Sequence, residues 1–216
     1  MRRTKEEAEI TRKKIIKVAF EVFLQEGYSK ARLEEVAKKA GVTRGAIYWH
    51  FGDKYRLFIS LLELGFSGHL DRVSKIIHSE VSPLTKIREL VKAPLTSLLE
   101  DEAYRGAMVL YSLKWEFTHE KHKKWETLQK QQKRKSKRLV SVAEYNQWLR
   151  TVIKGLIVEC IETGEIRSDV NPELTSFALA SYIDGVQSRY LIEPEVFKEE
   201  RIADRLVDFV MGSVID

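Results

Sequence analysis

Apolar residues recur every three or four positions along most of this chain, and that spacing decides what it can fold into. Ile16, Ala19, Phe20, Phe23 and Leu24, for example, fall at i, i+3, i+4, i+7 and i+8, which places them on one face of an α-helix. No segment alternates apolar and polar residues as a half-buried strand does. With 4 Pro and 11 Gly in 216 residues, the sequence also has few helix breakers. We therefore predict an all-α protein.

Glycines divide the first 53 residues into three helical segments. Gly27 can take the positive φ that ends the first segment, and Gly41 stops a second, shorter pattern over residues 33–40. Thr43 is then a suitable N-cap for a third short helix. Two short helices joined by a tight turn form a helix-turn-helix, one of the geometries by which proteins enter the major groove of DNA.

Longer amphipathic helices are predicted over the remainder of the chain. Asp53 can cap a helix that runs from Lys54 toward Ser79, and Pro83 suits the first turn of the next helix. Pro94 should kink or break that second helix. The other predicted helices cover residues 103–120, 140–163, 172–190 and 195–215.

Positive charge is concentrated in the first quarter of the chain. Residues 1–56 hold 14 Lys and Arg against 8 Asp and Glu, a net of +6, whereas the remainder holds 23 against 24. The formal excess of +5 therefore lies in the first segment, which suggests a polyanion as the partner of that segment. A merely solvated basic surface is the alternative that composition leaves open.

Several classes of protein are disfavoured by composition and motifs. The apolar run at residues 61–66 is interrupted by Glu63 and falls short of the roughly 20 residues of a membrane span, so no membrane association is expected. The single Cys160 lies in an apolar segment and is interpreted as a core residue; with the lack of a secretion signal it predicts a cytoplasmic location. No phosphate loop, nucleophile elbow or specific metal pattern supports an enzyme, and no cofactor is expected.

The stretch GVTRGAIYWHF, residues 41–51, carries large polar and aromatic side chains and little aliphatic content. Arg44, near the helix start, can make two hydrogen bonds to guanine O6 and N7, and Tyr48 and His50, one turn further along, can bond the flanking phosphates. A connector helix whose aromatic residues belong to the core is the alternative, and Phe51, and in part Trp49, fit it. The predicted DNA-binding residues of this region are Thr43, Arg44, Gly45, Ala46, Tyr48, Trp49, His50 and Lys54.

The segment from Ile15 to Leu62 resembles the DNA-binding module of the TetR family of transcriptional regulators, through AFEVFLQEGY and LEEVAKKAGVTRGAIYWHFGDKYRLF at their spacing. Further along, SPLTKIREL, LKWEF and YIDGVQSRYLIEPEVF are similar to segments of the AcrR-like repressors of multidrug efflux pumps. The resemblance covers nearly the whole chain. It implies a repressor of an efflux or transporter operon, released from a pseudo-palindromic operator by a lipophilic small molecule.

The same resemblance implies a homodimer of two-domain subunits. Residues 1–53 would form the N-terminal arm and helix-turn-helix domain, and residues 54–216 the helical ligand-binding and dimerisation domain. The last two helices, 172–190 and 195–215, would pair with their symmetry mates in a four-helix bundle. Arg32 stands where the family usually has Ser or Thr capping the second helix. That change loses the cap, at a cost of about 0.5–2 kcal/mol, and adds Arg32 to the predicted phosphate contacts.

A ligand site is implied in the second domain, because a sensor needs a pocket coupled to the helix that begins at Lys54. We place Glu116 there as the polar group, since a carboxylate among aromatic rings favours a cationic lipophile. Plain core packing of these aromatics, with Glu116 facing water, is the alternative. The predicted lining residues are Leu62, Phe66, Leu98, Met108, Tyr111, Trp115, Glu116, Trp148 and Phe177.

The last two predicted helices carry apolar faces that are too large for the surface of a monomer. In a homodimer they should meet across an isologous interface. The predicted interface residues are Tyr182, Ile183, Val186, Leu191, Leu206, Phe209 and Val210.

Two other patterns are less specific. Glu116, His119 and His122 drift by about 120° round a helix, so surface histidines explain them better than a metal site does. The basic run at residues 133–138 is more simply a solvated surface than a second nucleic-acid contact. Among functions, a DNA-binding regulator without an inducer and a regulator of a metabolic gene stay open.

Overall fold

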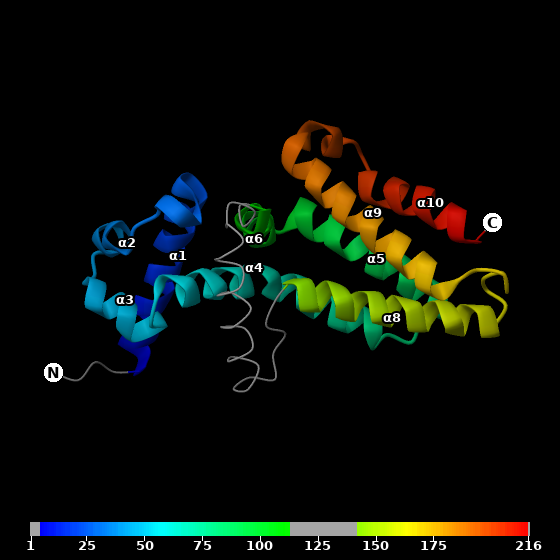
Figure 1. The fold of residues 1–216 in the computed structure, drawn as a ribbon, viewed down its shortest axis with the longest axis horizontal. Helices are drawn as coiled ribbons and strands as arrows, with labels where there is room; N and C mark the ends of the chain where they lie inside the picture. The colour runs from blue at the N-terminus through cyan, green and yellow to red at the C-terminus, as the bar shows by residue number, and fades with distance from the viewer. Residues whose placement is uncertain (1–4, 113–141, 216) are drawn as a thin grey trace. The chain divides into compact units, whose positions relative to one another are not determined.

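The computed structural model describes residues 5–112 and 142–215, and the regular elements within these two ranges are all helices (Figure 1). The predicted all-α class is therefore confirmed. The described residues form two compact units, and the boundary between them falls within one long helix, α4 (Lys54–Ile77). We call residues 5–68 with 102–112 the N-terminal unit, and residues 69–101 with 142–215 the C-terminal unit.

The N-terminal unit contains the three predicted short helices, the first part of α4 and one later helix. Its elements besides α4 are α1 (Lys5–Lys30), α2 (Leu33–Ala40), α3 (Arg44–Phe51) and α6 (Glu102–Ser112). The unit thus extends beyond residues 1–53 and includes α6. Its largest fully buried side chains include Ile15, Phe23, Ile47, Leu57, Phe58 and Leu61.

Caps and glycines set the helix ends in this unit much as the sequence predicts. Gly27 has φ 71° and ψ 164°, which interrupts α1, and Gly41 ends α2 in the left-handed region at φ 60°. The Thr43 side chain accepts a hydrogen bond from the Ala46 amide at 3.1 Å, so Thr43 is the N-cap of α3. Asp53 caps α4 by accepting from the Arg56 amide at 2.8 Å.

Helix α6 packs closely on α4 and on α1 within the N-terminal unit. A Cβ atom on Gly65 would lie 2.7 Å from the carbonyl oxygen of Ala103 and would also collide with Ala107. A Cβ atom on Gly106 would collide with the ring of Phe20. At position 65 only glycine allows this approach, because backbone atoms of Ala103 would have to move for a larger residue, whereas at position 106 the Phe20 ring would have to shift.

The C-terminal unit is a bundle around α5 (Pro83–Glu100) and the last part of α4. Helices α8 (Val142–Glu162) and α9 (Pro172–Ile192) pack on α5 and on each other, and α10 (Ile202–Ile215) packs on α5 and α9. Figure 1 shows α9, in orange, running beside α5. The fully buried centre of this bundle includes Ile87, Leu90, Val91, Ile153, Ile157 and Met211. Cys160 is also completely buried there, as predicted for a core residue, and burial raises the pKa of its thiol to about 11.

One helix boundary differs from the sequence prediction, and of the kink or break predicted at Pro94 the break does not occur. Helix α5 does not break at Pro94, which is buried within it together with Ala93 and Leu95, so apolar packing offsets the backbone hydrogen bond that proline cannot donate. The single helix predicted over residues 195–215 is instead a short 3-10 helix, η2 (Pro194–Lys198), followed by α10. Arg201, which lies between the two helices, adopts a positive φ of 57°.

The helices described by the structure do not include one that is both long enough and apolar enough to cross a membrane.

Candidate DNA-binding face and ligand site

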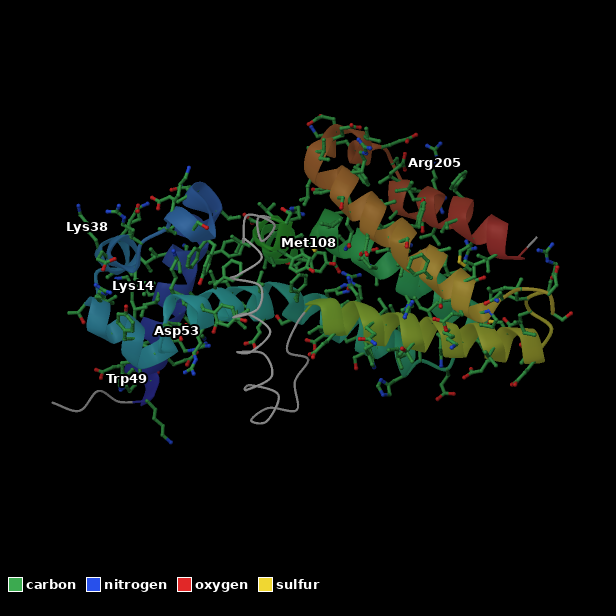
Figure 2. The ribbon with its side chains drawn as sticks, viewed as in Figure 1. Lys14, Lys38, Trp49, Asp53, Met108 and Arg205 are labelled. Carbon is green, nitrogen blue, oxygen red and sulfur yellow. The ribbon has the colours of Figure 1, made fainter. Side chains whose placement is uncertain are left out.

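Helix α3 presents one face to the core and another to solvent. Ile47 and Phe51 are buried, so Phe51 belongs to the core, as the alternative given in the sequence analysis predicted. Trp49 is 74 % exposed, and Figure 2 shows it at the surface of the N-terminal unit. Trp49 therefore does not belong to the core of its unit. Of the predicted DNA-binding residues, Arg32, Thr43, Arg44, Gly45, Tyr48 and Trp49 are exposed, and Ala46, His50 and Lys54 are half-buried.

The Arg44 side chain is already engaged on this face. Its Nη1 lies 2.5 Å from a carboxylate oxygen of Glu34 on α2, and its Nη2 donates a 2.8 Å hydrogen bond to the Tyr48 hydroxyl. The guanidinium also lies over the Tyr48 ring, 5.3 Å from its centroid. The hydrogen bond to Tyr48 and the charge of Glu34 raise the pKa of Arg44 above its usual value.

Glu34 was not among the predicted site residues. An acid in the first turn of α2 is an ordinary feature of a helix N-terminus, and the sequence gives no sign that this carboxylate reaches across to α3. The one hint in the sequence was the short turn between α2 and α3, which brings the two helices close enough for their side chains to meet. Arg32, next to it, takes the N-cap position of α2 without a side-chain capping bond, so the predicted loss of that cap is confirmed.

Lys54 is held close to its own unit. Its ammonium lies 4.7 Å from the centroid of the Tyr28 ring and donates to the carbonyl oxygen of Ser29 at 3.4 Å. Burial and the nearby Asp53 raise the pKa of Tyr28 to about 12, so this phenol stays neutral beneath the cation. These contacts hold the N-terminal end of α4 against the end of α1.

The predicted ligand-binding residues are distributed over both units. Leu62, Phe66, Met108 and Tyr111 belong to the N-terminal unit, where the Phe66 ring packs edge-on against Tyr104 at 5.3 Å. Trp115 and Glu116 lie outside the described residues, as do His119, His122 and the basic run 133–138. Leu98, Trp148 and Phe177 belong to the C-terminal unit, where Leu98 is buried and Phe177 is 55 % exposed. A cavity lined by all nine residues stays a prediction.

A buried polar cluster in the C-terminal unit was not predicted. His69 is 1 % exposed; its Nδ1 lies 3.0 Å from Ser97 Oγ and its Nε2 lies 2.6 Å from the Tyr145 hydroxyl. Burial, and then the charge of Arg72, lower the pKa of His69 to about 4, against a smaller opposing effect of Asp101. Ser97 and Tyr145 are 28 and 76 residues away from His69 in the sequence, so no local pattern could reveal this cluster.

The predicted dimer residues all lie on α9 and α10, and their side chains differ in solvent exposure. Phe209 is 78 % exposed, and Tyr182, Val186, Leu191, Leu206 and Val210 are half-buried. Ile183 is buried in the core of its own unit, which leaves little of it for a partner. Leu174 and Ile192 add exposed apolar area along α9.

The described residues hold no group of three or more His, Cys, Asp or Glu side chains that could bind a metal ion.

Two eight-residue helices joined at Gly41, the second with an exposed face of Arg44, Tyr48 and Trp49, define a helix-turn-helix DNA-binding protein. Residues 15–61 match the family described as bacterial regulatory proteins, tetR family, and residues 82–214 match the C-terminal region of MAATS-type transcriptional repressors. This chain belongs to the TetR family of transcriptional regulators.

Similar proteins span nearly the whole chain. The HTH-type transcriptional regulator AcrR of Shigella flexneri is 34% identical over 91% of this chain and 85% of its own length. The HTH-type transcriptional regulator TtgR of Pseudomonas putida is 31% identical over 90% and 87% of the two chains. The crystal structure of NalD, the secondary repressor of the MexAB-OprM multidrug efflux pump in Pseudomonas aeruginosa, superposes with a TM-score of 0.69 at 28% identity over 98% of each chain.

These matches confirm the resemblance seen in the sequence, both in the helix-turn-helix and in the later segments. They also confirm a regulator of transcription.

Proposed function

We propose that this protein represses an efflux-pump operon: a homodimer binds a pseudo-palindromic operator in the cytoplasm, and a lipophilic small molecule releases it. The observation that carries the DNA half of the proposal is the exposed face of α3, where Arg44, Tyr48 and Trp49 stand clear of the core that Ile47 and Phe51 help to form. A short helix with an arginine at its start can enter the major groove and bond guanine there.

The efflux half rests on similarity over the full length. NalD, which represses a multidrug efflux pump, shares 28% of residues with this chain over both domains. A match confined to the helix-turn-helix would support DNA binding alone, because the proposed ligand is bound by the remainder of the chain. The match over residues 82–214 to a repressor C-terminal region therefore supports a sensing role for the second domain.

The ligand in this proposal is a lipophilic cation bound by the predicted ligand-binding domain, residues 54–216. The Phe66 ring, which packs edge-on against Tyr104 with centroids 5.3 Å apart, supplies aromatic surface for such a ligand. Glu116 supplies the counter-charge in this proposal, and Trp115 a further ring. A ligand acts on DNA binding only through unequal affinity for the DNA-competent and incompetent states.

The first experiment selects bound duplexes from random DNA with the wild-type protein. The proposal expects a pseudo-palindrome whose half-sites are spaced by one helical turn or a multiple, and whose genomic copy lies upstream of a pump gene. A site upstream of a metabolic gene would instead favour a metabolic regulator. Failure to enrich any sequence would contradict specific operator binding.

The second experiment titrates the protein–operator complex with tetraphenylphosphonium and with neutral triphenylphosphine oxide, followed by fluorescence anisotropy of the labelled duplex. Release by the cation supports the proposal. Glu116→Gln should weaken release by the cation more than release by the neutral compound, and Trp115→Ala should weaken both while leaving DNA affinity nearly unchanged. If neither compound nor other lipophiles release the wild-type protein, the regulator without an inducer is favoured.

A further inference from the structure

Glu34 places a negative charge directly on the arginine that the DNA-binding face uses to read bases. The ion pair joins α2 to α3, with Glu34 Oε1 2.5 Å from Arg44 Nη1, while Nη2 of the same guanidinium is held by the Tyr48 hydroxyl at 2.8 Å. Both outer nitrogens are therefore engaged, each through one of its two hydrogens, and the other hydrogens remain available as donors.

This cluster lies at the surface. The side chains of Arg44 and Glu34 are 56% and 57% exposed, so DNA that reaches α3 reaches the ion pair as well. An exposed pair of this kind contributes little to folding stability, because water screens it and two long side chains must be ordered to form it. The ion pair therefore matters mainly for which groups of DNA can bind to Arg44.

Phosphate and guanine differ in charge as ligands of that guanidinium. A phosphate oxygen that approaches Arg44 must also approach the Glu34 carboxylate, and two like charges about 4 Å apart in water repel by roughly a factor of five in binding. The O6 and N7 atoms of guanine carry no formal charge, so they meet much less repulsion. A negative charge beside the arginine therefore penalises phosphate contacts more than base contacts.

We propose that Glu34 is a specificity-determining residue: it orients the Arg44 guanidinium together with Tyr48 and suppresses the binding of Arg44 to DNA phosphates, so that Arg44 contributes to base-specific binding and not to general DNA affinity. This inference rests on the proposed operator binding. It assigns Glu34 no bond to DNA of its own.

The test compares Glu34→Gln with Glu35→Gln. Both variants remove one negative charge from the first turn of α2, but Glu35 pairs with Lys39 at 2.8 Å on its own helix and not with Arg44. Glutamine at position 34 keeps an oxygen that can accept from Arg44, so the comparison isolates the charge. Binding is measured by anisotropy against a duplex with the sequence that the wild-type protein selects from random DNA, and against a scrambled duplex of the same length, over a range of salt concentrations.

Glu34→Gln should raise affinity for the scrambled duplex about three- to tenfold more than Glu35→Gln does, and should lower the ratio of selected to scrambled affinity. Its salt dependence on scrambled DNA should steepen by about one phosphate contact. In an Arg44→Ala background the difference between the two variants should vanish, which a role of Glu34 in folding alone would not produce.

Equal effects of Glu34→Gln and Glu35→Gln on the scrambled duplex would overturn the inference, because Glu34 would then act only through net charge. A loss of affinity for the selected duplex alone would overturn it too, since Glu34 would then be a DNA contact itself. Thermal melts of both variants check that the fold is intact. A wild-type protein that selects no sequence would contradict the proposed function itself, an outcome that is visible before any variant is made.

Discussion

The imidazole of His69 and the hydroxyl of Tyr145 lie 2.6 Å apart in the interior of the C-terminal unit, joining the end of α4 to α8. Ser97 on α5 completes the cluster through the other ring nitrogen at 3.0 Å. A buried imidazole with both nitrogens hydrogen-bonded is satisfied in its neutral form, and the cluster links α4, α5 and α8 by polar contacts.

Stability should fall in mild acid because of this cluster. The pKa of His69 is about 4 in the folded protein, against an ordinary value of 6.5, chiefly because burial disfavours the charged form. Between these two values the unfolded chain binds the proton and the folded chain does not, so the free energy of unfolding decreases as the pH falls from about 6.5 to 4. The full effect is roughly 3 kcal/mol at about 1.36 kcal/mol per pH unit.

Urea unfolding at pH 7 and pH 5, at one protein concentration, measures this effect. His69→Gln is the comparison, because loss of this buried imidazole should reduce the difference in stability between the two pH values. Tyr145→Phe should lower stability at pH 7 by about 1–3 kcal/mol, since it removes the partner of a buried nitrogen. Stability that is the same at both pH values would show that His69 is not held neutral.

The close approach of α6 to α4 gives a second prediction. Gly65→Ala should destabilise the protein by about 1–3 kcal/mol, because the added methyl would collide with Ala107 and with the carbonyl oxygen of Ala103. Gly155→Ala in α8 is the control: a Cβ atom there meets no atom within 4 Å, so alanine should stabilise its helix by up to about 1 kcal/mol. Denaturation midpoints of the two variants should therefore move in opposite directions, and a shared direction would contradict this packing.

The sequence predicts local features of this fold well because their causes are local. Thr43 as an N-cap and Gly41 with a positive φ each depend on a few neighbouring residues, and both are confirmed. The break allowed for at Pro94 does not occur, because the cost of proline is local while its compensation, burial in the packed helix, is tertiary. The break between η2 and α10 contains a positive φ at Arg201, a conformation that the residue type arginine does not predict.

The candidate site shows the same division. The exposure of Arg44 and Tyr48 follows from helical periodicity around the buried Ile47. The ion pair of Arg44 with Glu34 depends on how α2 and α3 are placed and on the rotamers of two long side chains. The spacing of residues in the sequence predicts neither of these. The His69 cluster likewise needs three segments that only the folded chain brings together.

Arg44 and Lys54 should differ in how they contribute to DNA binding. Arg44→Ala should cost about 1–3 kcal/mol with the selected duplex and should broaden the bases accepted at its position. Lys54 is held over the Tyr28 ring at the start of α4 and can reach only the backbone of DNA in this proposal, so Lys54→Ala should weaken all duplexes alike and reduce the salt slope. Repeated selection from random DNA with each variant separates the two effects; an unchanged base preference for Arg44→Ala would show that the assigned docking is wrong.

The assembly prediction turns on Phe209, which is 78 % exposed on α10 of a single subunit. A large apolar side chain in that position costs little to replace within the subunit, but in an isologous dimer it is buried twice, so roughly 3–6 kcal/mol of association free energy depends on it. Phe209→Lys should therefore keep the subunit folded and raise the dimer dissociation constant by about 100-fold or more.

Val196→Lys is the control, because Val196 is also exposed, at 56%, but lies on η2 outside the predicted interface. Sedimentation equilibrium over a range of concentrations, with circular dichroism to verify the fold, measures both variants. Phe209→Lys should also lose operator affinity, since two helix-turn-helix modules must be joined to bind a palindrome tightly. A Phe209→Lys protein that remains as dimeric as the Val196→Lys control would place the interface on another face of the subunit, and a wild type that is monomeric at micromolar concentration would contradict the dimer itself.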